Sequence, residues 1–192
     1  MKSSLHFFTL FCVVVGIAVT SAAAGDLAEV GGVYEMPKGY ANFAEAWGNS
    51  VGVKIRVATQ PSATDNLGLT FCWCRYPAAA SSFQYDATMI SVGLSQKSTF
   101  HDDAKIRPYI KGEAGLMQVS DVWRTTHDRV TGSALHTKVQ DGHSDSYLAG
   151  HMGLVFDVVP NYQIFVETGF LVTLQGQRKK VIPIQMGVAF HR

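Results

Sequence analysis

The chain has 192 residues, and its 16 Lys and Arg residues nearly balance its 15 Asp and Glu residues. Nucleic-acid-binding domains usually carry a marked excess of basic residues, and this chain has none, so a nucleic-acid partner is not expected. No segment after the N-terminal region holds about 18 consecutive apolar residues, which excludes helical membrane spans there. The length fits one domain.

The N-terminal segment has the features of a secretory signal peptide. Lys2 supplies a basic start, Leu5–Val19 is an apolar run that is short for a membrane span, and Ala22-Ala23-Ala24 offers a small-residue cleavage site. We therefore expect residues 1–24 to be removed after export and residues 25–192 to fold as one domain.

Apolar and polar residues alternate with a period of two along much of the remaining chain. In Val181–Phe190, for example, the residues at even positions are Ile, Ile, Met, Val and Phe, and they share one face. The residues at odd positions, on the opposite face, are mostly small or polar. Such alternation predicts β-strands. Each run has about ten residues, the length that a tilted strand needs to cross a bilayer. Eight strands are expected, at residues 27–36, 47–58, 67–76, 85–97, 107–120, 146–158, 162–172 and 181–190.

The predicted connections alternate between long and short. Long connections are expected at 37–46, 77–84, 121–145 and 174–180, and they alternate with tight turns at 60–66, 100–106 and 160–161, where Asp, Asn and Pro favour turns. Long loops on one rim and short turns on the other are typical of bacterial outer-membrane barrels, whose termini lie on the short-turn side.

The polar faces of these strands carry charges of both signs. If the apolar faces met lipid, the charges would enter the narrow interior of a barrel, where unpaired charges are costly. Balanced signs therefore favour a closed, charged lumen, although the solvated face of a soluble sandwich would tolerate the same balance. The residues predicted to form this lumen network are Glu29, Glu35, Lys54, Arg56, Lys111, Glu113, His151, Asp157 and Glu167.

The apolar faces are predicted to form the outer wall of the barrel. The residues expected to face lipid are Val53, Ile55, Leu69, Phe71, Ile90, Leu154, Phe156, Ile164, Val166, Phe170, Ile184, Met186 and Val188. Aromatic residues near strand ends are expected at the rims, where amphipathic rings settle at lipid headgroups. These residues are Tyr34, Trp47, Trp73, Tyr76, Tyr109, Trp123, Tyr162 and Phe190.

Four segments together resemble a known family: V-G-G-V-Y-E-M-P at Val30–Pro37, R-P-Y-I-K-G-E-A-G-L at Arg107–Leu116, N-Y-Q-I-F-V-E-T-G-F at Asn161–Phe170 and I-P-I-Q-M-G-V-A-F at Ile182–Phe190. The chain resembles the small outer-membrane β-barrel proteins of the OmpA-like membrane-domain type over nearly its whole mature length. The resemblance implies an eight-stranded, antiparallel, up-and-down transmembrane β-barrel, inserted into the outer membrane of a Gram-negative bacterium by the assembly machinery. It implies no catalytic motif. The family usually ends in an aromatic residue, whereas Phe190 is followed here by His191 and Arg192.

Two cysteines remain after cleavage, Cys72 and Cys74. Two residues apart on a strand, they point to the same side, and a disulfide between them would be strained. The pair alone lacks the further ligands that a zinc site needs, so we expect the two side chains simply to fill the interior.

The loop predicted at residues 121–145 contains His127, His136 and His143. Their spacing matches no compact ligand motif, so no metal and no cofactor are expected.

The run His143-Ser144-Asp145-Ser146 raises the hypothesis of a hydrolase acting on lipid A. Neighbours in sequence rarely place a nucleophile and its base correctly, so no enzymatic activity is expected.

Three basic residues in the last long connection are candidates for contact with lipopolysaccharide phosphates: Arg178, Lys179 and Lys180. The alternative is a charged loop that is simply hydrated.

The sequence thus predicts a monomeric integral outer-membrane protein with a plugged, charged lumen, embedded in outer-membrane lipid and lipopolysaccharide. Its role is expected to be structural or to involve surface interaction through its outer loops. Three alternatives remain open: a porin-like small pore or channel for small or hydrophobic solutes, a soluble lipocalin-like periplasmic lipid carrier, and a lipid A-modifying enzyme.

Overall fold

The computed structural model describes residues 27–38, 47–60, 62, 64–77, 86–100, 104–120, 122–127, 134–140, 142–175 and 179–191, with the backbone alone described for 122–127 and 134–140. Within these ranges, no helix is long and apolar enough to cross a membrane.

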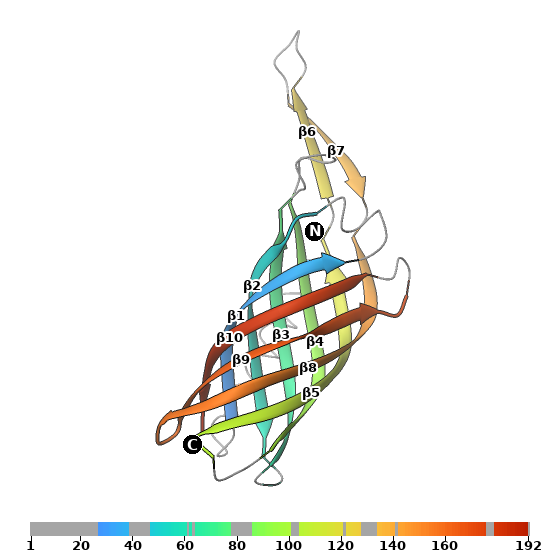
Figure 1. Ribbon diagram of the computed structural model, residues 1–192. Coiled ribbons are helices and arrows are strands. Elements are labelled where there is room, and N and C mark those ends of the chain that lie inside the picture. Colours follow the sequence, from blue (N-terminus) through green and yellow to red (C-terminus); the bar gives the residue numbers. More distant parts are fainter. Residues whose placement is uncertain are drawn as a thin grey trace.

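Eight antiparallel strands close into a barrel (Figure 1). Each barrel strand pairs with the barrel strand that follows it, with β5 pairing with β8, and β1 and β10 pair to close the sheet, so it has no open edge. This topology confirms the predicted eight-stranded, up-and-down fold. The barrel strands are β1 (Leu27–Lys38), β2 (Ser50–Thr59), β3 (Asp65–Tyr76), β4 (Ala87–Thr99), β5 (Ile106–Val119), β8 (His143–Val159), β9 (Tyr162–Thr173) and β10 (Lys180–Phe190).

The connection between β5 and β8 contains a second, small sheet. The strands β6 (Val122–His127) and β7 (Ala134–Gln140) pair with each other and extend beyond the barrel, at the end opposite the C-terminus (Figure 1). The long connection predicted at 121–145 therefore contains a hairpin that was not predicted from the sequence, and β8 already begins at His143. Val, Trp and Thr residues in 122–126 give this segment a strand propensity that its polar composition obscures.

The turn between β8 and β9 has the form that the sequence predicts. Pro160 and Asn161 connect the two strands, and Asn161 adopts a φ of 71°. Asparagine tolerates this left-handed conformation better than most residues, and proline presets the backbone before it. The two strands can therefore reverse direction within two residues.

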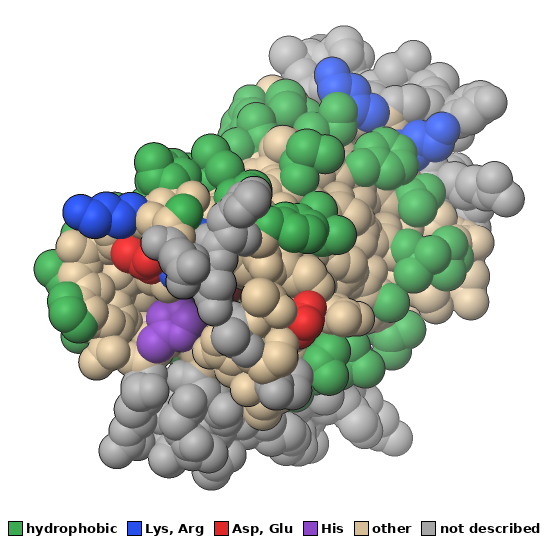
Figure 2. All heavy atoms as spheres, turned by 60° about the horizontal axis from the view of Figure 1, so that its bottom comes forward, with side chains coloured by type: hydrophobic (Ala, Val, Ile, Leu, Met, Phe, Trp, Pro, Cys, Tyr) green, Lys and Arg blue, Asp and Glu red, His purple; other side chains and the backbone are tan. Residues whose placement is uncertain are grey.

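The strands alternate strictly between an inner and an outer face. On β9, Phe165 and Glu167 are buried, whereas Ile164, Val166 and Phe170 are exposed. Every residue predicted to face lipid lies on the outer wall, half-buried or exposed. Seen from the short-turn end, apolar side chains cover much of the visible flank of the barrel (Figure 2).

The interior is packed in layers. An apolar cluster near the long-loop end includes Cys74, Met89 and Val181. A second apolar cluster near the short turns includes Leu27 and Phe165. Buried charged side chains occupy the space between the two clusters. The barrel therefore has a solid core and a charged middle layer.

Glycines make room for large side chains in this narrow interior. A Cβ atom at Gly153 would lie 2.6 Å from the Tyr109 ring and 2.5 Å from the backbone oxygen of Val166. Gly150, three residues earlier on the same strand, is exposed and has no atom within 4 Å of its Cβ position. Of these two glycines, only Gly153 is required by close packing.

Gly153→Ala is therefore expected to lower the free energy of unfolding by about 1–3 kcal/mol, because the new methyl group overpacks the interior. Gly150→Ala is the matched control, and it should be neutral or raise the stability by up to about 1 kcal/mol by removing backbone entropy. Denaturant unfolding of the purified, folded protein measures both values. Equal effects of the two substitutions would contradict the placement of Tyr109 over Gly153.

Candidate functional site

The first element of the charged interior is an ion pair that crosses the lumen. The Lys54 Nζ on β2 lies 2.6 Å from the Glu113 Oε2 on β5, and both side chains are buried. Tyr147 on β8 donates a hydrogen bond of 2.5 Å from its hydroxyl to the other oxygen, Glu113 Oε1. Each oxygen of the Glu113 carboxylate is thereby bound by a donor from another strand.

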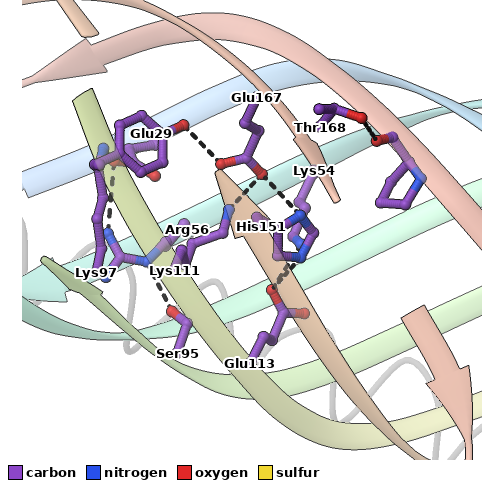
Figure 3. Close-up of polar contacts among 12 residues, drawn as sticks. Glu29, Lys54, Arg56, Ser95, Lys97, Lys111, Glu113, His151, Glu167 and Thr168 are labelled. Atoms are coloured by element: carbon purple, nitrogen blue, oxygen red, sulfur yellow. Dashed lines mark hydrogen bonds and ion pairs between the residues drawn. The ribbon is translucent and has the colours of Figure 1, made fainter. Parts of the chain in front are cut away.

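Glu167 on β9 is held in the same way by two residues of β5. Lys111 donates to Glu167 Oε1, and the Tyr109 hydroxyl donates to Glu167 Oε2 at 2.7 Å. His151 lies between the two carboxylates, with its Nδ1 3.5 Å from Glu167 Oε1 and its Nε2 4.0 Å from Glu113 Oε2 (Figure 3). The imidazole thus bridges two ion pairs at distances longer than a normal hydrogen bond.

A third group of contacts surrounds Glu29 on β1, toward the short-turn end. The Lys97 Nζ lies 2.6 Å from Glu29 Oε1, and the Arg56 Nη1 lies 3.5 Å from the same oxygen. The Arg56 Nε also donates to Ser95 Oγ at 2.7 Å (Figure 3). Lys97 lies over the Tyr109 ring, 4.1 Å from its centre, which adds a cation–π contact.

Strand register explains why these charges need partners across the lumen. Lys111 lies directly opposite Lys97 on one neighbouring strand and His151 on the other, so basic groups stand side by side on the wall. Like charges in such positions destabilise a sheet. Carboxylates from β1, β5 and β9 neutralise them, and the resulting contacts fill the middle of the barrel.

Two further polar clusters lie toward the long-loop end. The Glu35 carboxylate on β1 accepts a hydrogen bond from the Tyr76 hydroxyl and a longer one, 3.4 Å, from Ser50 Oγ. In the second cluster the Lys179 Nζ lies 2.6 Å from Asp145 Oδ2. Both carboxylates are buried, so these donors offset the cost of removing them from water.

Most of the residues predicted for the lumen are buried inside the barrel, and one lies elsewhere. Glu29, Glu35, Lys54, Arg56, Lys111, Glu113, His151 and Glu167 face inward. The side chain of Asp157 is 41% exposed at the short-turn rim, where its Oδ1 lies 2.6 Å from the Arg107 Nη2. Asp157 shares the parity of the inner face, but β8 extends past the enclosed part of the barrel at this point.

The short-turn rim around Asp157 is polar. Gln163 Nε2 donates to Asp157 Oδ1 at 2.7 Å, and the His191 Nε2 lies 2.8 Å from Gln163 Oε1. Burial, together with repulsion from Lys97, lowers the pKa of His191 below its ordinary value. His191, which follows Phe190, therefore takes part in the hydrogen-bond network of the rim.

Sequence reasoning missed Lys97 and the roles of three tyrosines. Lys97 continues the inner parity of β4, so extending the alternation by one step would have found it. Tyr76 and Tyr109 were expected at the rims but are buried as hydrogen-bond donors, as is Tyr147. Buried tyrosine hydroxyls seek such partners, and the charged interior supplies them.

The remaining rim aromatics divide between the two faces. Trp47 is buried, contrary to expectation, because it packs in the apolar cluster near the long-loop end. Tyr34, Trp73, Tyr162 and Phe190 are exposed on the outer wall, and the last two rings pack edge to face at 5.2 Å. The side chain of Trp123 lies outside the described residues.

The basic residues considered for lipopolysaccharide contact have different surroundings. Arg178 lies outside the described residues, and Lys180 is half-buried in β10. Lys179 is buried and its ammonium points to Asp145, with the His143 ring close by. The side chains of His127 and His136 also lie outside the described residues.

Removal of one partner from a buried ion pair is expected to be costly. Lys111→Met should lower the free energy of unfolding by about 3–5 kcal/mol, because it leaves the Glu167 charge without its cation. The double variant Lys111→Met/Glu167→Gln should recover a large part of this loss. A double-mutant cycle on unfolding free energies measures the coupling, and additive effects of the two substitutions would contradict the contact.

The sequence matches no protein-family model. It matches no curated protein either. The fold, in contrast, is similar to those of several solved outer-membrane proteins. Neisserial surface protein A has a TM-score of 0.59 and 14% sequence identity, over 88% of this chain and 97% of that protein's chain.

Two further structures show the same likeness. OprG from Pseudomonas aeruginosa has a TM-score of 0.57 and 9% identity, over 86% of this chain and 95% of its own. The attachment invasion locus protein Ail of Yersinia pestis, solved with the heparin analogue sucrose octasulfate, has a TM-score of 0.54 and 16% identity, over 88% of this chain and 99% of its own. At these identities the likeness concerns the fold. The chain has the closed, eight-stranded fold of small outer-membrane β-barrels.

Proposed function

We propose that this chain is an integral outer-membrane protein with a closed lumen, exported by its N-terminal signal, and that it acts at the cell surface through its long-loop end. The observation that carries the proposal is the inverted polarity of the barrel. Paired charges fill its interior, whereas large apolar side chains on its wall, including Leu94, Leu116 and Met152, are about two-thirds exposed. Lipid is the solvent that suits such a wall.

The same polarity disfavours a soluble, lipocalin-like carrier. Such a carrier needs an apolar cavity for its ligand and a polar surface for water. Here the Lys54–Glu113 and Lys97–Glu29 pairs occupy the interior of the barrel. An aqueous exterior would instead leave the outer wall as an apolar patch far larger than soluble monomers carry.

The lumen contacts also support a closed barrel over a pore. The Lys54–Glu113 and Lys97–Glu29 ion pairs join strands that do not neighbour each other, so they cross the interior rather than lining its wall. An open channel would require several of these buried pairs to separate. A buried ion pair that loses one partner destabilises the folded state by about 3–5 kcal/mol.

The long-loop end supports a role in surface interaction. The β6–β7 hairpin extends beyond the barrel rim, which gives a paired and therefore ordered backbone outside the membrane-embedded wall (Figure 1). In this arrangement a rigid barrel presents a projecting element to other molecules. We include lipopolysaccharide contact through Arg178 and Lys180 in the proposal, but not through Lys179, whose ammonium is bound to Asp145.

A lipid A hydrolase built on residues 143–146 has little support. Ser144 is exposed and Asp145 is buried, because neighbouring residues on β8 point to opposite faces. His143 Nε2 lies 3.4 Å from Asp145 Oδ2, on the side away from Ser144. A nucleophile needs its base within hydrogen-bond reach, so we propose that the protein acts without turnover.

Fractionation of cells that express the full chain tests the proposed location. We expect recovery in the outer membrane and a mobility on electrophoresis that changes when the sample is boiled in detergent. Recovery in the soluble periplasm without a mobility change would overturn the proposal. The same preparation, placed in planar bilayers, should show no stable single-channel steps, whereas regular conductance steps would favour the pore.

Val166→Arg tests the lipid-facing wall directly. The substitution places a charge at the middle of β9 on the outer face, and it should weaken folding into phospholipid vesicles by about 2–4 kcal/mol. Leu174→Arg, just beyond the end of β9, is the matched control and should cost only about 0–1 kcal/mol. Equal effects at the two positions would show that the wall does not lie in the bilayer.

A further inference from the structure

Two thiols and a carboxylate converge in the interior at the long-loop end of the barrel. Cys72 and Cys74 both point inward from β3, and their sulfur atoms are 3.5 Å apart. A Glu35 carboxylate oxygen, from β1, and the two sulfur atoms all lie within 4.8 Å of one another, and all three side chains are buried. The sequence gives no hint of Glu35 here, because it comes from a different strand.

The intervening strand allows this convergence because it carries a glycine. Gly52 on β2 lies between Val33 of β1 and Cys74 of β3 in the register. A Cβ atom at Gly52 would lie 2.6 Å from the Cys74 sulfur, so the sulfur occupies the space that a side chain would fill. From there the thiol reaches across β2 toward the carboxylate of Glu35.

We propose that Glu35, Cys72 and Cys74 form a binding site for one Zn²⁺ ion. Thiolate and carboxylate are both zinc ligands, and a site with three protein ligands keeps a fourth, tetrahedral position for water. Zn–S bonds of about 2.3 Å in tetrahedral geometry separate two sulfurs by about 3.8 Å. The 3.5 Å separation observed therefore has to widen by only a few tenths of an ångström.

The surroundings suit a cation that binds thiolates. Tyr76 and Ser50 donate hydrogen bonds to Glu35 and so fix its carboxylate, as outer partners of metal ligands do. Two thiolates and a carboxylate bring three negative charges, of which Zn²⁺ neutralises two. The site lies beside the Lys54–Glu113 ion pair, because Lys54 is opposite Cys72 in the β2–β3 ladder. Binding releases the two thiol protons to solvent, so affinity falls as the pH falls.

A disulfide is the competing fate of these thiols. It would require the sulfurs to approach from 3.5 Å to about 2.05 Å while both residues stay in β3. Extended strand geometry separates the Cα atoms of residues two apart by more than about 6 Å, near the upper limit for a disulfide. Metal binding, in contrast, leaves the strand nearly unchanged.

Cd²⁺ titration of the full chain, folded in detergent and kept in a phosphine reductant, tests the proposal. Cd²⁺ replaces Zn²⁺ at such ligands and gives a thiolate-to-metal absorption band in the ultraviolet. We expect one equivalent to bind and Zn²⁺ to remove the band by competition. Cys72→Ser and Cys74→Ser should each abolish the band, and Glu35→Gln should weaken Cd²⁺ binding about tenfold or more.

Glu167→Gln is the matched control, because it makes the same change in a buried carboxylate next to Lys111 and Tyr109 instead of the thiols. It should leave the stoichiometry and the band intact, and the heat-dependent mobility shows that each variant is folded. Absence of the band in the reduced chain would overturn the proposal. So would a band that persists in both serine variants, or a Cys72–Cys74 disulfide that resists the reductant.

Discussion

The structure depends on one constraint: a closed eight-stranded barrel has an interior too narrow and too dry for an unpaired charge. Inward-facing ions are therefore bound by partners from other strands, several of them from across the lumen. Lys54 binds Glu113, which lies 59 residues away, and Lys97 binds Glu29, which lies 68 residues away. Such pairs are sensitive to register, because a slip by one residue turns every inward charge to the outer wall. The charged layer thus specifies the pairing of the strands as well as filling the space between them.

This constraint separates the two faces of the barrel by function. The wall needs only to be apolar, so residues such as Leu94 and Met186 can vary in shape without disturbing the interior. The middle of the lumen is occupied by ion pairs and tyrosine hydroxyls. The thiol and carboxylate cluster and the β6–β7 hairpin are both found at the long-loop end.

The sequence predicts the barrel well because the signal for a strand is local. Period-two alternation in each strand, with long and short connections in turn, is enough to assign the inner and outer faces. It does not reveal partners across the lumen, because these depend on the stagger between strands. Glu167 is buried in the interior, and its link to Tyr109 follows from the register of β5, β8 and β9. Glu35 and Cys74 also come together because of the strand register, with Gly52 leaving space between them. The β6–β7 hairpin was missed for a different reason, namely its polar composition.

The pairing of β1 with β10 joins the two ends of the described chain, from Ala28 opposite Phe190 to Lys38 opposite Lys180. The sheet therefore has two unpaired edges until the last strand is in place. Contacts between segments so distant in sequence form slowly, since the entropy of closing the whole chain is lost before they stabilise it. Until that strand pairs, the sheet consequently has open edges, and its charged and apolar faces are both exposed. Closure of the barrel is therefore a late event in folding.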